Sequence, residues 1–185
     1  MSAPESNPVK RPATILAGPY GHPFHPIAIT VPIGAWVASF VFDVIGLLAA
    51  DPAPYAVGSR VLIAIGLVGS IPAILFGIHD YLRIPERTRA SSAGTFHMGL
   101  NLTICGGYLF QAFYRTSTDD IPVFGVVLSV VSLLLLSISG WLGGKLSYRW
   151  GVRVAAETTQ AEGFRTPEVP ASPGTAAPPP QRGAH

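Results

Sequence analysis

Cysteine and charged residues are both scarce in this sequence, and each shortage excludes a class of protein. The single cysteine, Cys105, excludes an intrachain disulfide, a Cys-x-x-Cys zinc site and a cysteine-ligated iron–sulfur cluster. Charged residues make up 12% of the 185 residues, well below the roughly 25% of a soluble domain. The net charge of +2 and the lack of an interleaved basic and aromatic patch give no indication of a nucleic-acid partner.

Short catalytic motifs are also missing. The sequence has no Gly-x-Ser-x-Gly elbow, no His-Glu-x-x-His pair and no P-loop. These absences argue against a hydrolase and favour a protein without enzymatic activity. They leave other chemistries open.

Long apolar runs are abundant instead. Hydrophobic residues make up 49% of the chain, and the mean hydropathy is +0.42. A membrane-spanning helix needs about 20 apolar residues, and four segments qualify, at about 27–48, 61–82, 93–113 and 123–146. The loops between them are short, so neighbouring helices should be antiparallel. The sequence therefore predicts an all-α integral membrane protein, a four-helix up-down-up-down bundle in a lipid bilayer.

Lysine and arginine are distributed unevenly between the two ends of these segments. The side that holds the N-terminus carries Lys10, Arg11, Arg83, Arg87, Arg89, Lys145, Arg149, Arg153, Arg165 and Arg182. The opposite side carries only Arg60 and Arg115. Because cytoplasmic loops are enriched in basic residues, we predict that both termini are cytoplasmic.

The two ends of the chain differ in composition from the apolar part. Residues 1–19 form a polar N-terminal tail, and residues 155–185 are rich in alanine and proline. Both lack the hydrophobic pattern of a packed element, so we predict disordered termini around a membrane domain at 20–154.

Four histidines fall at one depth of the predicted bundle. His22 and His25 precede the first segment, His79 ends the second, and His97 lies about one turn into the third. Asp80 belongs to the same layer. The prolines in "HPFHP" favour polyproline geometry, which would place His22 and His25 on one face, roughly 9 Å apart.

Several roles are open for this histidine layer. The side chains can cap helix ends or form structural hydrogen bonds. They can also ligate a metal or a haem, most easily through His25 and His97 or through His79 and His97 on facing helices. Proton transfer and quinone binding are further alternatives, because ionisable groups in spans are candidates for function.

Asp43 lies in the last third of the first segment, far from the histidine layer. A carboxylate at that depth should face the helices and find a donor. Asn101, Thr103 and Gln111 of the third segment are candidates, with Gln111 at the better depth. Asp43 and the polar residues Asp80 and Asn101 could alternatively belong to a proton path.

Four stretches together resemble a known family. These are "GHPFHPIAITVPIGAWVASFVFDVIGL", "GIHDYLRIPERTRA", "FHMGLN" and "SGWLGGKLSYRWGVRV". In this order and spacing they resemble the bacterial membrane proteins of the domain of unknown function 2231 family, over about residues 20–154. Some relatives carry a fused Rieske-type domain, which implies redox chemistry. Lys145 and Trp150 stand where relatives often have Glu and His, which removes possible ligands.

Three functional hypotheses follow for this protein of the bacterial cytoplasmic membrane. The first is a non-enzymatic membrane module or subunit with a membrane-protein partner or a second copy of itself. The second is a redox component that binds haem or quinone at the histidine layer. The third is a small proton-coupled transporter that uses Asp43. Gly140 and Gly144 form a small-xxx-small pair that predicts close helix packing, within the chain or in a dimer.

Overall fold

The computed structural model describes residues 7–115 and 120–165, and every regular element in these ranges is helical. Two short 3-10 turns, Pro8–Lys10 and Ile15–Ala17, precede the main helices. The α-helices are α1 (His25–Ala28), α2 (Thr30–Leu48), α3 (Ala53–Tyr81), α4 (Arg89–Tyr114), α5 (Val123–Gly144) and α6 (Glu157–Glu162). A π-helical turn, Lys145–Arg149, continues α5.

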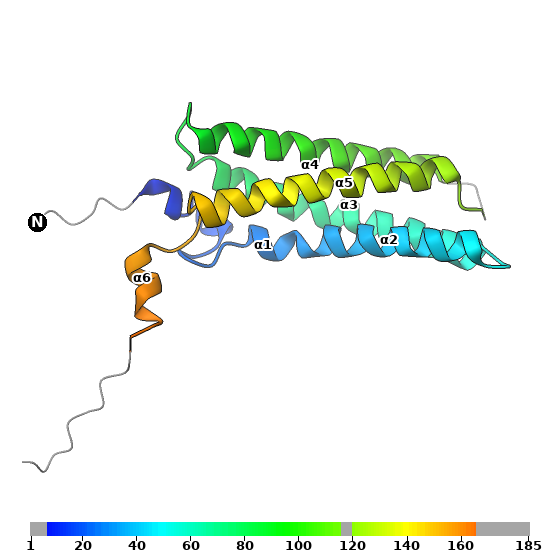
Figure 1. The fold of residues 1–185 in the computed structure, drawn as a ribbon, viewed down its shortest axis with the longest axis horizontal. Helices are drawn as coiled ribbons and strands as arrows, with labels where there is room; N and C mark the ends of the chain where they lie inside the picture. Colours follow the sequence, from blue (N-terminus) through cyan, green and yellow to red (C-terminus); the bar gives the residue numbers. More distant parts are fainter. Residues whose placement is uncertain (1–6, 116–119, 166–185) are drawn as a thin grey trace, which may run out of the picture.

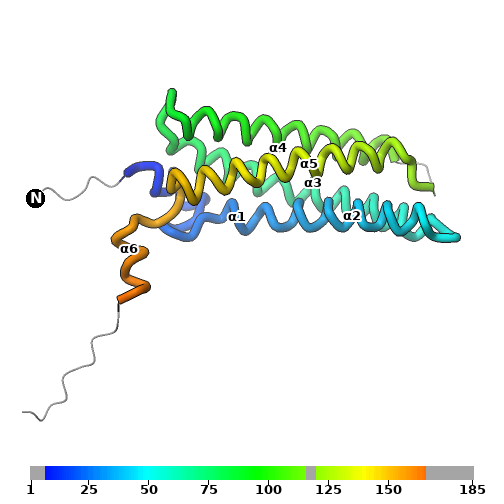
Figure 2. The backbone as a smooth tube through the Cα atoms, viewed as in Figure 1, coloured from blue at the N-terminus to red at the C-terminus, as the bar shows by residue number. Residues whose placement is uncertain are grey.

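The long helices α2, α3, α4 and α5 lie side by side (Figure 1). α2 packs most extensively on α3 and α4 on α5, while contacts of α3 with α4 and of α2 with α5 complete the set. α2 and α4 consequently occupy opposite corners. The N-terminal turns, α1 and α6 all lie at the same end of the long helices (Figure 2).

Within the described residues, three helical segments are long and apolar enough to cross a membrane. They are His25–Leu48, Ala53–Tyr81 and Val123–Arg149. α4 has sufficient length, 26 residues, but it also contains His97, Asn101, Gln111 and several serines and threonines. The structure therefore gives three candidate spans where the sequence predicts four.

The helices turn large apolar side chains outward and bury small and polar ones. The buried polar residues of the long helices are Ser39, Asp43, Ser59, Ser70, Asp80, Gln111, Ser129, Ser132 and Ser139. Valine, leucine, isoleucine and phenylalanine dominate the exposed surface. An apolar exterior of this extent suits contact with lipid tails, which need no hydrogen bonds.

The first predicted helix is divided in two and begins earlier than expected. α1 starts at His25 and ends at Ala28, and one residue, Ile29, which keeps right-handed helical dihedral angles, separates it from α2 at Thr30. Pro32 has no N–H to donate to Ala28, which explains a break at this point. The prediction of polyproline geometry through His25 is wrong, because Pro26 fits the first helical turn.

Two other helices also begin before their predicted starts. α3 begins at Ala53, two turns before the predicted residue 61, because Pro52 and Pro54 are tolerated at a helix start. α4 begins at Arg89, where the Thr88 side chain accepts a hydrogen bond from the backbone N–H of Ser91 at 3.0 Å. This is an N-cap contact, and it ends the loop after α3.

Residues 7–19, which the sequence assigns to a polar tail, contact one end of the long helices. Val9 is buried in a cluster with Ile84, Leu146 and Val152. Nη2 of Arg153 donates to the carbonyls of Ala17 and Gly18, both at 3.0 Å. The two terminal segments therefore cover one end of the helices. The predicted disorder at 1–6 and 166–185 lies outside the described residues.

Candidate functional site

Two of the four predicted layer histidines face each other across the helices. His25 lies on α1 and His97 on α4, with ring centroids 6.4 Å apart and ring planes at 80°. α1 continues into α2, which occupies the corner opposite α4. The pair therefore spans the interior diagonally rather than joining neighbouring helices.

Each ring is fixed by a backbone carbonyl of a neighbouring helix, α3 for His25 and α5 for His97. Nδ1 of His25 lies 2.8 Å from the Ala73 carbonyl oxygen on α3. Nδ1 of His97 lies 2.9 Å from the Ser139 carbonyl oxygen on α5. Four residues beyond each carbonyl is a glycine. A Cβ at Gly77 would lie 3.1 Å from Cε1 of His25, and one at Gly143 would lie 3.3 Å from Cε1 of His97.

These contacts define the protonation of both rings in their neutral form. A carbonyl oxygen only accepts, so Nδ1 carries the hydrogen and Nε2 holds the lone pair. At His97 the Ser139 hydroxyl also lies 2.9 Å from Nδ1 and accepts from the same N–H. Near His97, the Asn101 amide nitrogen lies 3.2 Å from Nε2, and it also donates to the Ser139 hydroxyl at 2.7 Å. Anchoring of Nδ1 by a carbonyl is the usual support for a histidine that ligates a metal through Nε2.

A pocket of about 200 Å³ contains both histidines in its lining. Its walls are mostly apolar and come from α1 to α5, with Trp36 and Cys105 toward the middle of the helices. Exposed residues on all four long helices are also part of the lining, among them Ile33, Ile78, Leu102 and Gly140, so the pocket reaches the outer surface of the helices. A mostly apolar pocket with a few convergent polar groups is typical of small-ligand sites.

Asp80 and Arg153 line the end of this pocket nearest the termini. Nε of Arg153 lies 2.7 Å from Oδ1 of Asp80, and the two side chains are 3% and 11% exposed. Asp80 therefore pairs with an arginine from the C-terminal segment and not with a histidine. Within the described part of the chain, Nη1 of Arg153 has no hydrogen-bond partner.

His22 and His79 lie outside this arrangement. The exposed His22 has its Nδ1 3.4 Å from the Tyr20 carbonyl oxygen. Nδ1 of His79 lies 2.7 Å from the Leu75 carbonyl oxygen of its own helix. Neither residue lines the pocket. Only His25 and His97 of the predicted layer share a site.

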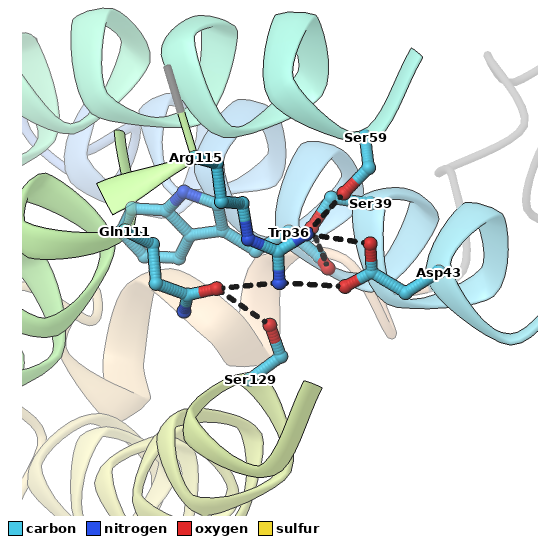
Figure 3. Close-up of polar contacts among 7 residues, drawn as sticks. All are labelled: Trp36, Ser39, Asp43, Ser59, Gln111, Arg115 and Ser129. Atoms are coloured by element: carbon cyan, nitrogen blue, oxygen red, sulfur yellow. Dashed lines mark hydrogen bonds and ion pairs between the residues drawn. The ribbon is translucent and has the colours of Figure 1, made fainter. Parts of the chain in front are cut away.

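Asp43 belongs to a separate buried network toward the other end of the helices (Figure 3). Arg115 donates from Nη1 to Oδ1 of Asp43 at 2.6 Å and from Nη2 to Oδ2 at 2.9 Å. The same guanidinium donates to the Ser59 hydroxyl at 3.1 Å and to Oε1 of Gln111 at 2.7 Å. The Ser129 hydroxyl donates to the same Oε1 at 3.2 Å. The network joins α2, α3, α4 and α5.

The family assignment covers both the pocket and the network. The model of the family described as "Predicted membrane protein (DUF2231)" matches residues 21–156. The chain belongs to this family. No curated protein and no solved structure matches the chain significantly.

Sequence reasoning about this DUF2231 protein missed three parts of the two sites. It placed Arg115 among exposed loop charges, although its side chain is 2% exposed at the end of α4. It did not pair Arg153 with Asp80. It expected Gly140 and Gly144 to pack closely within the chain or in a dimer; within the chain, no atom lies within 4 Å of a Cβ at Gly140, and packing in a dimer stays a prediction. The small pair Ser139 and Gly143 contacts His97 instead, and the sequence contained that spacing.

Proposed function

We propose that this DUF2231 protein is a four-span, non-enzymatic module of the bacterial cytoplasmic membrane that binds a largely apolar ligand. The observation that carries the proposal is the pocket beside His25 and His97. Both rings are fixed through Nδ1 to a neighbouring helix. Nε2 of His25 is left available for a ligand, and Nε2 of His97 lies 3.2 Å from the Asn101 amide nitrogen, which a ligand would displace. Rings held in this way are preorganised for binding, which lowers the entropic cost of association.

The side chains of α4 point in directions that support this helix as the fourth span of an up-down-up-down bundle. Phe96, Leu102, Leu109, Phe110 and Phe113 are 50–72% exposed on its outer side. Its polar side chains at 97, 101 and 111 contact other residues inside. A helix that contributes polar groups to a site has a lower average hydropathy, although the face it turns to lipid is apolar.

The distribution of basic residues supports cytoplasmic termini. Lys10 and Arg83 lie at the end of the helices that holds the terminal segments, while Arg115 is withdrawn into the interior at the other end. That leaves Arg60 as the basic residue of the opposite side. With the buried Arg115 and Arg153 both set aside, the sequence count of ten against two becomes nine against one.

The contacts of Asp43 favour a structural role over proton-coupled transport. Both carboxylate oxygens accept from Arg115, and the side chain is fully buried. A bidentate, desolvated ion pair holds its charge and geometry strongly. A transport role for this carboxylate would require the pair to break in each cycle.

Filling the pocket mouth tests ligand binding directly. Gly140 lines the pocket, and a Cβ there has no neighbour within 4 Å, so Gly140→Phe should place a ring in the opening without disturbing the helices. We expect native mass spectrometry of wild-type protein, released from mild detergent, to show a bound small molecule. The Gly140→Phe variant should lose it.

Gly106→Phe is the matched control for this substitution. Gly106 is exposed on α4, has the same open surroundings and does not line the pocket. The control variant should keep the bound molecule at the wild-type level. A wild-type protein without any bound molecule, or equal loss in both variants, would contradict the proposed function.

A further inference from the structure

We propose that the ligand of this pocket is an iron porphyrin, held by Nε2 of His25 and Nε2 of His97 as the two axial ligands. The inference rests on the proposed binding function and names the chemical class of the ligand. Three observations favour a porphyrin over the other ligands that a histidine layer can bind. They are the separation of the two rings, the tautomers of the two histidines and the number of protein side chains that could ligate a metal.

The separation of the two rings fits one metal ion between them. An imidazole nitrogen lies about 2.0–2.1 Å from a bound ion such as zinc. The centre of a five-membered ring with bonds of about 1.33 Å lies about 1.1 Å from each ring atom. Two imidazoles on opposite sides of one ion would therefore have centroids about 6.4 Å apart. The observed separation is 6.4 Å.

The hydrogen bonds prepare both rings for ligation. Nδ1 of His25 is held by the Ala73 carbonyl on α3, and Nδ1 of His97 is held by the Ser139 carbonyl on α5. Nε2 is then the unprotonated nitrogen of both neutral rings, as a metal ligand must be. At His97 the iron would displace the Asn101 amide nitrogen, which lies 3.2 Å from Nε2. The two rings come from helices at opposite corners, an arrangement that suits a cofactor inside a helix bundle.

The number of donors distinguishes a porphyrin from a bare metal ion. No group of three or more His, Cys, Asp or Glu side chains in residues 7–115 and 120–165 is placed to hold a metal ion. Protein zinc sites use at least three protein ligands. A porphyrin supplies four equatorial nitrogens itself, so haem iron needs only axial protein ligands.

The pocket lining provides room for a flat ring system. Ala73, Gly77, Gly140 and Gly143 present little or no side chain on α3 and α5. A porphyrin is larger than the pocket of about 200 Å³, but the pocket is open to the outer surface, so part of the macrocycle would project between the helices toward lipid. An apolar macrocycle edge is compatible with that exposure.

Arg153 adds a partner for the acidic groups that a biological porphyrin carries. The side chain is 3% exposed, lines the pocket and has no hydrogen-bond partner at Nη1. A carboxylate would satisfy this buried donor with a charge-assisted hydrogen bond. The site therefore matches a porphyrin at its metal and at its carboxylate end.

Spectroscopic titration tests the inference. Full-length protein in mild detergent is titrated with iron protoporphyrin IX, and separately with Zn²⁺ and with a short-chain quinone. We expect saturation at one porphyrin per chain, a shifted Soret band and the electron paramagnetic resonance signal of six-coordinate, low-spin ferric iron. No saturable binding is expected for Zn²⁺ or for the quinone.

Histidine variants provide the matched controls. His25→Ala and His97→Ala should each weaken porphyrin binding at least tenfold and abolish the low-spin signal. His22→Ala and His79→Ala should bind within twofold of wild type, because neither residue lines the pocket. Adding imidazole to His97→Gly should restore the low-spin signal, which separates the loss of a ligand from misfolding.

Three outcomes would overturn the inference: no saturable Soret shift in wild-type protein, five-coordinate iron unchanged by substitution of either pocket histidine, or equal losses in all four variants. Binding of the quinone in place of the porphyrin would also overturn it. If mass spectrometry still finds a Gly140-dependent bound molecule, the proposed binding function stands and only the porphyrin assignment fails. If neither assay finds a ligand, both proposals fail.

Discussion

Arg115 and Asp43 carry the strongest polar interaction among the long helices. Their two charge-assisted hydrogen bonds are 2.6 and 2.9 Å long, and the side chains are 2% and 0% exposed. In such surroundings the desolvation cost of one charge is offset only while its partner is present. Removing one member should therefore be much worse than removing both.

This expectation gives a prediction for the stability of the network. Asp43→Leu and Arg115→Met should each lower the free energy of unfolding by about 3–5 kcal/mol, because one buried charge is left unpaired. The double variant should recover most of that loss. Thermal and chemical unfolding in mild detergent measures all three.

Asp51→Asn is the control for this cycle, since Asp51 is exposed and lies in the loop after α2. It should change the free energy of unfolding by less than about 0.5 kcal/mol. Single variants as stable as this control, or a double variant less stable than both singles, would refute the coupling.

The sequence predicted that Asp43 needs an internal donor, but it did not predict which one. Gln111 was expected to contact it, and Gln111 is present in the network, where it accepts from Arg115. Arg115 follows the last apolar residues of its segment, so its sequence position is that of a loop charge. Only the packing of α4 against α3 and α5 shows that its side chain turns inward.

α4 is the element on which the membrane topology depends. It has the length to cross a bilayer core of about 30 Å, since 26 residues rise about 39 Å. Its outer face is apolar, and its inner face contributes His97, Asn101 and Gln111 to the two sites. The proposed pocket requires α4 to lie at the same membrane depth as α1 and α5.

Cysteine labelling tests the position of α4. In a Cys105→Ala background, a membrane-impermeant maleimide should label Glu86→Cys only from the cytoplasmic side and Tyr114→Cys only from the opposite side. Leu102→Cys should resist the reagent from both sides, because that position faces lipid. Intact and inverted vesicles provide the two directions of access.

Asp51→Cys is the reference for the second side, because the loop after α2 should share a side with Tyr114. Labelling of Glu86→Cys and Tyr114→Cys from one and the same side would show that α4 does not cross the membrane.

The helix boundaries illustrate what the hydrophobic pattern could and could not predict. The apolar runs located the long helices because the side chains of each run must be either buried in the protein or in contact with lipid. They did not locate the helix starts, which depend on local contacts. Thr88 caps α4, Pro52 and Pro54 open α3, and Pro32 divides the first helix at Ile29.

At the scale of the whole molecule, the protein has an apolar exterior and two separate polar sites inside. The pocket lies near the end that carries both terminal segments, and the Asp43 network lies toward the other. Depth along the helices could be estimated from the sequence, which placed four histidines in one layer. Which of these histidines meet depends on the direction in which each side chain leaves its helix. That direction depends on helix rotation and on small neighbouring residues such as Gly77 and Gly143.

The central claim is that His25 and His97 face one ligand between them. A crystal structure grown in a lipidic mesophase, from protein purified without added ligand, tests this most directly. The account predicts continuous electron density between the two Nε2 atoms, with both Nδ1 atoms still bonded to the carbonyls of Ala73 and Ser139. An absence of electron density between the two Nε2 atoms, or a pocket filled by the protein's own side chains, would contradict it.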